Sequence, residues 1–288
     1  MNLSSRDVRW KSALILYYDY EFSGNIRNNF GSQCSIHQIA ARSKSDRFFC
    51  RINPYLSKEQ VEPPVHPKYS MPSEDEFKEL EADSFRAAYD KFLGFVLRLL
   101  LKRKKRWVCL ISHNGFRSDK IVLEHELSYH KLQAYPFFFM DSLLYIREVH
   151  PGLQSYSLEN VFKSLFPEKS YKAHDAEMDT DALYAIVQKL KKPLHGVLYP
   201  MLTIPWRNIS GIGYHSEQGL LAAGFSDIVS FFLATRGSRQ RTIECLIYAG
   251  VVSNEKLIEN IFHWYKLAET MMVYREQNAL CRSPPPPA

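Results

Sequence analysis

The sequence predicts a mixed α/β domain, with a sheet flanked by helices, followed by a small all-helical domain. Between Trp10 and about Lys192, short apolar runs typical of strands alternate with helical patterns. After Pro193 no convincing strand alternation follows. The chain has 288 residues, 45% of them hydrophobic. This length suits one domain of about two hundred residues and a smaller second one.

Four apolar runs in the first domain predict strands, and the early ones are expected to pair antiparallel. These runs are residues 14–18, 34–41, 47–52 and 107–111. A long helix is expected near Ser84 to Lys102, just before the last strand. Residues 53–75 carry many prolines and charges without clear periodicity, which indicates a surface loop.

Acidic and histidine residues lie where these elements begin or end. Asp19 and Glu21 lie at the C-terminal end of the first strand, and residues two apart in a strand point to the same face. Asp119 lies in the first turn of a helix after the fourth strand. His174 and Asp179 are separated by a spacing that favours a loop-to-helix transition over one continuous helix. We expect these five side chains to meet at one site.

Four converging carboxylates predict a divalent metal site, because their charges otherwise repel one another. Mg²⁺ prefers oxygen ligands and usually binds through a few carboxylates and a substrate phosphate. A histidine beside such a site adds a group that accepts a proton near neutral pH. This set is what two-metal phosphodiester hydrolysis requires.

The three segments resemble the three motifs of the DEDDh 3′–5′ exonucleases, in the branch of ribonuclease T and the three-prime repair exonucleases. Asp-x-Glu, His-Asn-Gly-x-x-x-Asp and His-x-Ala-Glu-x-Asp occur in that order, in a match from about Leu14 to Leu190. The chain is also similar to the related module encoded by the ninth exon of the promyelocytic leukaemia gene. Ser118 stands where the family usually has an aromatic residue, which loosens the packing behind Asp119 but leaves the ligand in place.

The resemblance implies an RNase H-like exonuclease fold and hydrolysis of terminal phosphodiesters at the 3′ ends of single-stranded DNA or RNA. It implies two bound Mg²⁺ ions, which Mn²⁺ can replace, and a histidine that takes the proton of the attacking water. The implied metal ligands are Asp19, Glu21, Asp119 and Asp179, and the implied base is His174.

Four further residues are candidates for substrate binding. Phe22 and Ser23 follow the first motif, where family members contact the terminal nucleotide. Packing beside the strand is an alternative role for Phe22. His113 and Asn114 begin the second motif, where Asn114 is expected to position the loop that carries Asp119.

Each acidic residue alone also fits a simpler role, such as a solvated strand end or a charge that complements a helix dipole. The occurrence of all five residues, in the order of the three motifs, argues against coincidence. Two other functions stay open. One is an inactive exonuclease-like scaffold that binds nucleic acid or protein, and the other is an exoribonuclease specific for short oligoribonucleotides. No residue can be assigned to the 2′-hydroxyl, so the sequence favours neither DNA nor RNA.

We expect the exonuclease domain to span residues 1–195 and a helical accessory domain to span residues 196–275. The turn at Gly211 and Gly213 resembles a helix-hairpin-helix, whose glycine N–H groups meet a phosphate. A SAP-like module is equally compatible. From residue 196 onward eight Lys and Arg face seven Asp and Glu, so domain packing or protein binding rivals nucleic-acid contact. The proline-rich residues 276–288 are expected to be disordered.

Composition predicts an intracellular protein, nuclear or cytoplasmic, without membrane contact. The net charge of +6 suits a polyanionic partner. Five scattered cysteines without a CxxC pair are typical of reduced thiols. The N-terminus lacks an apolar signal core, and no run reaches transmembrane length. The basic run of residues 102–106 is either a localisation or nucleic-acid signal or a solvated loop.

Overall fold

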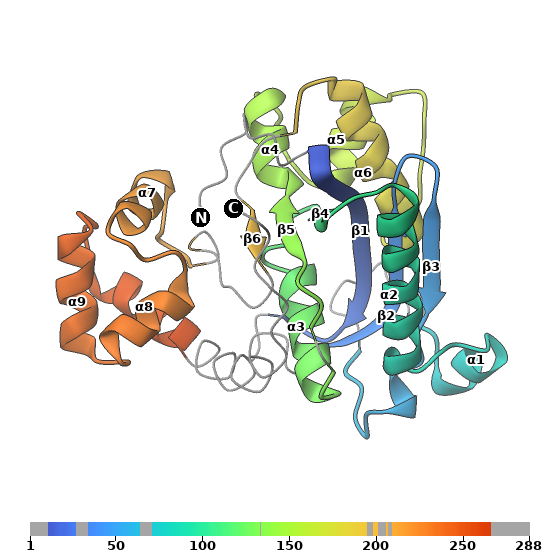
Figure 1. The fold of residues 1–288 in the computed structure, drawn as a ribbon, viewed down its shortest axis with the longest axis horizontal. Helices are drawn as coiled ribbons and strands as arrows, with labels where there is room; N and C mark the ends of the chain where they lie inside the picture. Colours follow the sequence, from blue (N-terminus) through green and yellow to red (C-terminus); the bar gives the residue numbers. More distant parts are fainter. Residues whose placement is uncertain are drawn as a thin grey trace. The chain divides into compact units, whose positions relative to one another are not determined.

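The computed structural model describes residues 11–26, 34–63, 71–132, 134–194, 198–200, 206 and 209–265. The chain divides into two compact units, and the boundary lies between Leu198 and Tyr199. Figure 1 shows the first unit as a sheet between layers of helices and the second as a group of helices. Each unit is described by itself below.

The first unit contains a mixed five-stranded sheet in the order β3-β2-β1-β4-β5. β2 pairs antiparallel with β1 and β3, whereas β4 is parallel to both β1 and β5. The predicted mixed sheet flanked by helices is therefore confirmed. The strands are β1 (Ala13–Ser23), β2 (Ser35–Arg42), β3 (Arg47–Arg51), β4 (Trp107–Ser112) and β5 (Phe138–Asp141).

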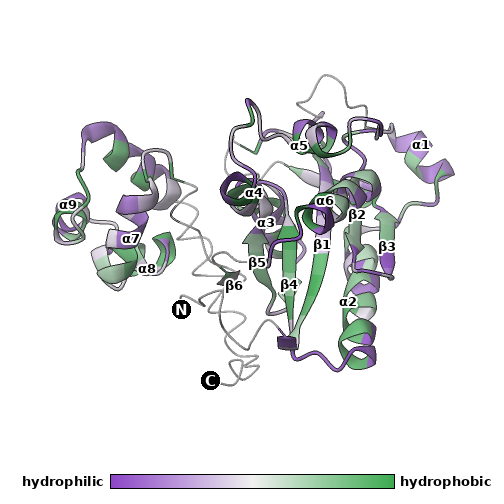
Figure 2. Cartoon of the chain, turned by 90° about the horizontal axis from the view of Figure 1, so that it is seen from above, coloured by the Kyte–Doolittle hydropathy of each residue, from purple (hydrophilic) through white to green (hydrophobic). Residues whose placement is uncertain are grey.

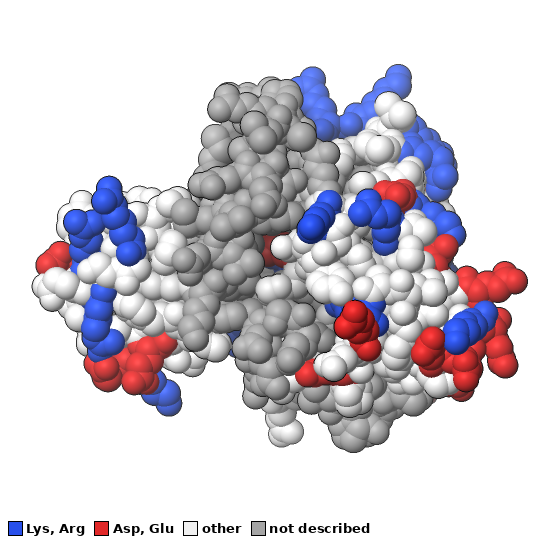
Figure 3. All heavy atoms as spheres, turned by 90° about the horizontal axis from the view of Figure 1, so that it is seen from below, with Lys and Arg blue, Asp and Glu red and all other residues white. Residues whose placement is uncertain are grey.

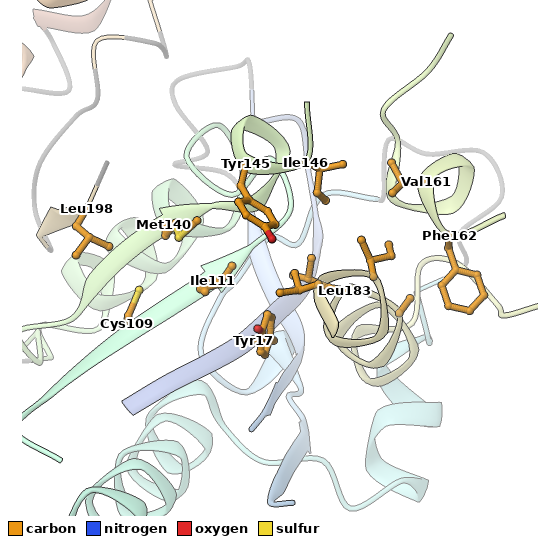
Figure 4. Close-up of a cluster of buried hydrophobic side chains, with 13 residues drawn as sticks. Tyr17, Cys109, Ile111, Met140, Tyr145, Ile146, Val161, Phe162, Leu183 and Leu198 are labelled. Carbon is orange, nitrogen blue, oxygen red and sulfur yellow. The ribbon is translucent and has the colours of Figure 1, made fainter. Parts of the chain in front are cut away.

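One face of the sheet is covered by α6 (Ala176–Leu190), which lies against β1 and β2. Tyr17 on β1 and Leu183 on α6 belong to one buried core, visible in Figure 4. Side chains along a strand alternate between its faces, so Asp19 and Glu21 share the face of Tyr17. The alternation that buries Tyr17 thus aims both carboxylates at the layer that contains α6.

Two shorter helices complete this layer, and they are α4 (Ser142–Val149) and α5 (Leu158–Leu165). Tyr145 and Ile146 of α4, with Val161 and Phe162 of α5, are buried in the same core (Figure 4). Figure 2 shows hydrophobic residues along β1 and β4, the two central strands that this core covers. The core fixes the place of α6 relative to β1, which the site requires.

The opposite face packs against α2 (Phe85–Lys102). The ring of Phe48 on β3 lies 5.6 Å from that of Phe92 and 5.5 Å from that of Phe95, measured between centroids. Phe92 also contacts Phe137 just before β5. These aromatic contacts anchor α2 to the edges of the sheet.

The segment of residues 53–75, predicted to be a loop, contains a short 3₁₀ helix, η3 (Pro54–Leu56). Its predicted end at residue 75 is also wrong, because a helix begins before it. A further helix, α1 (Glu74–Glu79), begins inside it because Ser73 and Glu76 form a reciprocal capping box. Acidic side chains of this helix lie together at the right of Figure 3.

The second unit begins with the two-residue strand β6 (Tyr199–Pro200) and contains two similar helical hairpins. Each hairpin turns at a glycine with positive φ, Gly224 (91°) or Gly250 (67°). The next residue donates its N–H to a carbonyl at the preceding helix end in both turns. The helices are α7 (Tyr214–Ala222), α8 (Ile228–Thr235), α9 (Arg239–Tyr248) and the helical residues 255–265.

The expected disordered tail, residues 276–288, lies outside the described residues. Gly211 has a positive φ of 99°, and Gly213 is the N-cap of α7. The helix-hairpin-helix and SAP-like interpretations of this unit both stay predictions. None of the described helices has the length and apolar character that a membrane span requires.

Candidate metal site

Three of the predicted ligands meet at the junction of β1 and α6. Carboxylate oxygens of Asp19, Glu21 and Asp179 lie within 4.8 Å of one another. Asp19 and Glu21 come from the shared face of β1, and Asp179 comes from the first turn of α6. The spacing in the sequence and the packing of α6 on the sheet together produce this cluster.

His174 lies on a tight turn directly before α6, as its spacing from Asp179 predicted. Its φ of +64° is left-handed, and its side chain is partly exposed. Its backbone N–H donates to Oδ2 of Asp179 over 3.0 Å. Oδ1 of Asp179 is buried and has no hydrogen-bond partner among the described residues. The turn thus fixes one oxygen of Asp179 and leaves the other available.

Asp119, the fourth predicted ligand, lies outside the group of three and is held by its own donors. It is the first residue of α3 (Asp119–Tyr129) and is 3% exposed. The N–H of Tyr20 donates to its Oδ1 over 3.1 Å, and the Ser118 hydroxyl donates to its Oδ2 over 2.7 Å. Ser118, which replaces the usual aromatic residue, therefore forms a direct hydrogen bond to the predicted ligand.

The electrostatics of the cluster oppose a fully ionised state. Burial, followed by repulsion from Asp119 and Asp179, raises the pKa of Asp19 well above its usual range. Burial and the same two neighbours raise the pKa of Glu21 to about 8. Burial also raises the pKa of Asp179 to about 7, although the His174 N–H lowers it. Without a cation, these carboxyls compete to keep protons.

The donor set fits a hard divalent cation. All of the clustered ligand atoms are carboxylate oxygens, which Mg²⁺ and Mn²⁺ prefer over the nitrogen and sulfur ligands of zinc sites. The buried Oδ1 of Asp179 supplies an acceptor that the protein itself does not satisfy. A cation at this place would relieve both the repulsion and the unpaired oxygen.

The predicted substrate-binding residues differ in their surroundings. Phe22 is half-buried beside a β-bulge, where the register of β1 and β2 shifts between Glu21 and Phe22. Ser23 is fully buried. Asn114 is exposed and has a left-handed φ of +60°. These positions leave Phe22 and Asn114 accessible to a ligand.

His113 makes hydrogen bonds within the protein through both ring nitrogens. Its Nε2 lies 2.7 Å from the carbonyl oxygen of Tyr156, and its Nδ1 lies 3.1 Å from the hydroxyl of Ser142. A carbonyl only accepts, so Nε2 carries the hydrogen and Nδ1 accepts from Ser142. Burial lowers the pKa of this histidine. The neutral ring ties the second motif to α4.

Two residues outside the predicted set contact the segments that carry it. The side-chain oxygen of Gln38 on β2 accepts the N–H of Ala176 at the start of α6 over 3.2 Å. Asp141 at the end of β5 accepts the N–H of Asn114 over 2.9 Å. Neither belongs to a motif. The sequence signal for Asp141 was an apolar run ending in Asp-Ser, which suits a strand followed by a helix cap.

The basic run of residues 102–106 lies away from the carboxylates. It precedes Trp107, which pairs with Ala13 at the start of β1, whereas Asp19 and Glu21 lie near the end of that strand. Lys102 and Arg103 form ion pairs with Asp46. The run therefore contributes no charge directly to the metal site.

Comparisons with known proteins show partial sequence similarity to one exonuclease. The chain is 31% identical to three-prime repair exonuclease 1 of Bos taurus and 30% identical to that of Homo sapiens, each over 113 residues. Each match covers 36% of this chain and 36% of the relative, so the chain spans about a third of the relatives it matches. No protein-family model matches the chain.

Two solved structures have similar folds. One is the 3′-exonuclease in a structure of histone mRNA stem-loop recognition, with 12% identity and a TM-score of 0.46 over 65% of this chain and 69% of that one. The other is the nuclease domain of the DEDDh family member 3′hExo bound to rAMP, with 12% identity and a TM-score of 0.45 over 64% of this chain and 94% of that one.

The first unit resembles an exonuclease domain of the DEDDh 3′–5′ type. The resemblance rests on the partial sequence similarity to three-prime repair exonuclease 1 and on the order of the motif residues.

Repulsion within the cluster predicts how the stability of the metal-free chain depends on pH. The pKa values of Glu21 and Asp179 in the folded chain are raised above their values near 4 in the unfolded chain. At pH values between the unfolded and the folded pKa, the folded chain therefore binds more protons than the unfolded chain. The stabilisation is complete below about pH 4 and is lost as pH rises through 7 and 8. The free energy of unfolding, measured with denaturant in the presence of EDTA, should fall between pH 5 and pH 8.5 by about 1–3 kcal/mol more in wild type than in Asp179→Asn.

Buried histidines contribute equally to the pH dependence of stability in wild type and in Asp179→Asn. The difference between the two stability curves therefore reports on the carboxylate cluster alone. Asp75→Asn, a change at an exposed carboxylate of α1, should follow the wild-type curve. Parallel curves for wild type and Asp179→Asn would contradict the predicted repulsion.

Gly115 predicts a second measurable effect. A Cβ at this position would lie 1.5 Å from the Ser112 hydroxyl oxygen and 3.4 Å from Oδ2 of Asp119. Gly115→Ala should therefore lower the free energy of unfolding by about 1–3 kcal/mol, because the loop must move. Thermal and urea unfolding measure this change.

Gly94→Ala in α2 is the matched control. A Cβ there meets nothing within 4 Å, so alanine should raise the stability by about 0.5–1 kcal/mol through its better helix propensity. Equal stability of Gly115→Ala and wild type would show that the loop is not packed as described.

Proposed function

We propose that this chain is a metal-dependent 3′–5′ exonuclease that removes terminal nucleotides from single-stranded DNA or RNA. The observation that carries this proposal is the convergence of the carboxylate oxygens of Asp19, Glu21 and Asp179 within 4.8 Å of one another. The resemblance of the domain to DEDDh exonucleases supports the choice of reaction, and the raised pKa values support a bound cation.

In the proposed mechanism, Asp19, Glu21, Asp119 and Asp179 hold two Mg²⁺ ions, and Mn²⁺ can replace them. When bound, such ions supply Lewis-acid activation of the attacking water and stabilise charge on the departing 3′ oxygen. The Tyr20 N–H and the Ser118 hydroxyl keep the Asp119 carboxylate in place, and the His174 N–H does the same for Asp179.

His174 is proposed as the general base that accepts the proton of the attacking water. Its backbone bond to Asp179 keeps it next to the cluster, while its ring is partly exposed. Phe22 and Asn114, which are accessible, are proposed to contact the terminal nucleotide. Ser23 and His113, as placed, support these contacts from within the protein.

The second unit is proposed to be an accessory domain, either helix-hairpin-helix-like or SAP-like. The cysteines in the described residues (Cys34, Cys50, Cys109 and Cys245) are free thiols, which supports action in a reducing compartment, the nucleus or the cytoplasm.

The direct test is degradation of 5′-labelled single strands of DNA and RNA, with and without Mg²⁺. We expect stepwise shortening from the 3′ end, no cutting of a circular strand, and resistance of a strand that ends in a 3′-phosphate. Asp19→Ala and Asp179→Ala should abolish shortening while the fold remains intact, because removing repelling carboxylates does not destabilise the metal-free chain.

Asp75→Ala is the control, since this carboxylate is exposed on α1. Activity within about tenfold of wild type in either cluster variant would overturn the ligand assignment. Binding of single strands without any shortening would favour the inactive scaffold, and activity on RNA of a few nucleotides alone would favour an oligoribonuclease.

The proposed base makes a separate prediction. His174→Ala should lower the rate about a hundredfold to ten-thousandfold, as expected for loss of a general base. Its affinity for Mn²⁺ and for single-stranded substrate should stay near that of wild type, because its side chain is not among the clustered ligands. Single-turnover rates and binding titrations measure the two effects separately.

His215→Ala, a change at an exposed histidine on α7, should leave the rate unchanged. If His174→Ala loses metal affinity in proportion to its loss of rate, His174 belongs to the metal site and is not the base.

A further inference from the structure

Asp141 lies outside all three motifs, yet its carboxylate is buried among backbone donors. It is 6% exposed at the end of β5 and is the N-cap of α4. Its Oδ1 accepts the N–H of Leu143 over 2.9 Å and the N–H of Asn114, also over 2.9 Å. The N–H of Phe116 also bonds to this carboxylate. One side chain therefore ties the start of α4 to the loop of the second motif.

The loop that Asp141 holds is the segment that leads into Asp119. Asn114 adopts a left-handed backbone there, a conformation that surrounding contacts must maintain. Gly115 packs directly against Ser112, which is the β4 partner of Asp141 in the parallel register. The loop thus sits between the end of β4 and the carboxylate of Asp141.

The residue after Asp141 holds the same loop from its other end. The Ser142 hydroxyl donates to Nδ1 of His113, which begins the second motif. The junction of β5 and α4 therefore contacts three loop residues, and Ser118 at the end of this loop donates to the Asp119 carboxylate. The position of Asp119 depends on the loop, and the loop depends on this junction.

We propose that Asp141 is a positioning residue for the metal site, which fixes the loop of residues 113–118 and through it the Asp119 carboxylate. This inference rests on the proposed function, since it assigns Asp141 to the same site. Asp141 binds backbone N–H groups and is not itself a ligand.

A carboxylate suits this task better than a neutral side chain. Ionised aspartate only accepts hydrogen bonds, so both of its oxygens can face N–H donors. Asparagine keeps one accepting oxygen, but its NH₂ group would face one of the donors. Asp141→Asn should therefore retain part of the function and Asp141→Ala very little.

The test uses the full chain with Asp141→Ala, Asp141→Asn and a matched cap control, Ser84→Ala. Ser84 caps α2 through a bond to the N–H of Ala87, away from the second motif. Three properties are measured: Mn²⁺ affinity by calorimetry, amide exchange of residues 113–118, and the turnover number with saturating substrate. Urea unfolding confirms that each variant is folded.

We expect Asp141→Ala to weaken Mn²⁺ binding or turnover about 10- to 100-fold and to speed exchange in the loop. Asp141→Asn should lie between wild type and alanine, and Ser84→Ala should stay within about twofold of wild type. Wild-type Mn²⁺ affinity, turnover and exchange in Asp141→Ala would overturn the proposal. An equal loss in Ser84→Ala would also overturn it, because general destabilisation would then explain the effect.

The two proposals fail in different ways. If wild type binds Mn²⁺ but degrades no nucleic acid, the proposed function is wrong. In that case the Mn²⁺ affinities and the exchange rates of the variants still decide the role of Asp141.

Discussion

The repulsion among buried carboxylates is the constraint on which the first domain depends. Carboxylate oxygens of Asp19, Glu21 and Asp179 lie within 4.8 Å of one another, and the pKa values of these groups are raised by burial and by the charges of neighbouring carboxylates. Such an arrangement costs stability unless protons or cations neutralise it. The protein therefore has to hold these groups together with packing that lies elsewhere.

That packing is the core between the sheet and the layer of α4, α5 and α6. Tyr17 is buried there and lies two residues before Asp19 on β1. Leu183 is also buried there and lies about one helical turn after Asp179 on α6. Backbone N–H groups orient the carboxylates without supplying a full positive charge, as at Tyr20 and His174. The geometry is thus set in advance, and a divalent cation, as proposed above, would neutralise the carboxylates.

Much of this architecture could be predicted from the sequence because the signals are local. The apolar run before Asp19 predicted a strand, and the period of two placed Asp19 and Glu21 on one face. The spacing of His174 and Asp179 predicted a turn before a helix, which the structure places at Ala176. Asp119 was predicted to lie in the first turn of a helix, and α3 begins at this residue.

Other features could not be predicted, because they depend on contacts between distant segments. The sequence placed Asp19 and Glu21 at the end of the first strand, and β1 continues two residues further, to Ser23, since β2 supplies pairing partners for these residues. β5 was missed because it has only four residues. The bond from Ala176 to Gln38 joins residues 138 positions apart, and no local pattern reports such a contact.

The most direct test of this account is the number of Mn²⁺ ions that the chain binds, measured by calorimetry with metal-free protein at pH 8. The account predicts two saturable ions per chain and the loss of at least one of them in Asp19→Asn, with the exposed-site variant Asp75→Asn unchanged. Mn²⁺ binding that is absent in wild type, or identical in wild type and Asp19→Asn, would contradict it.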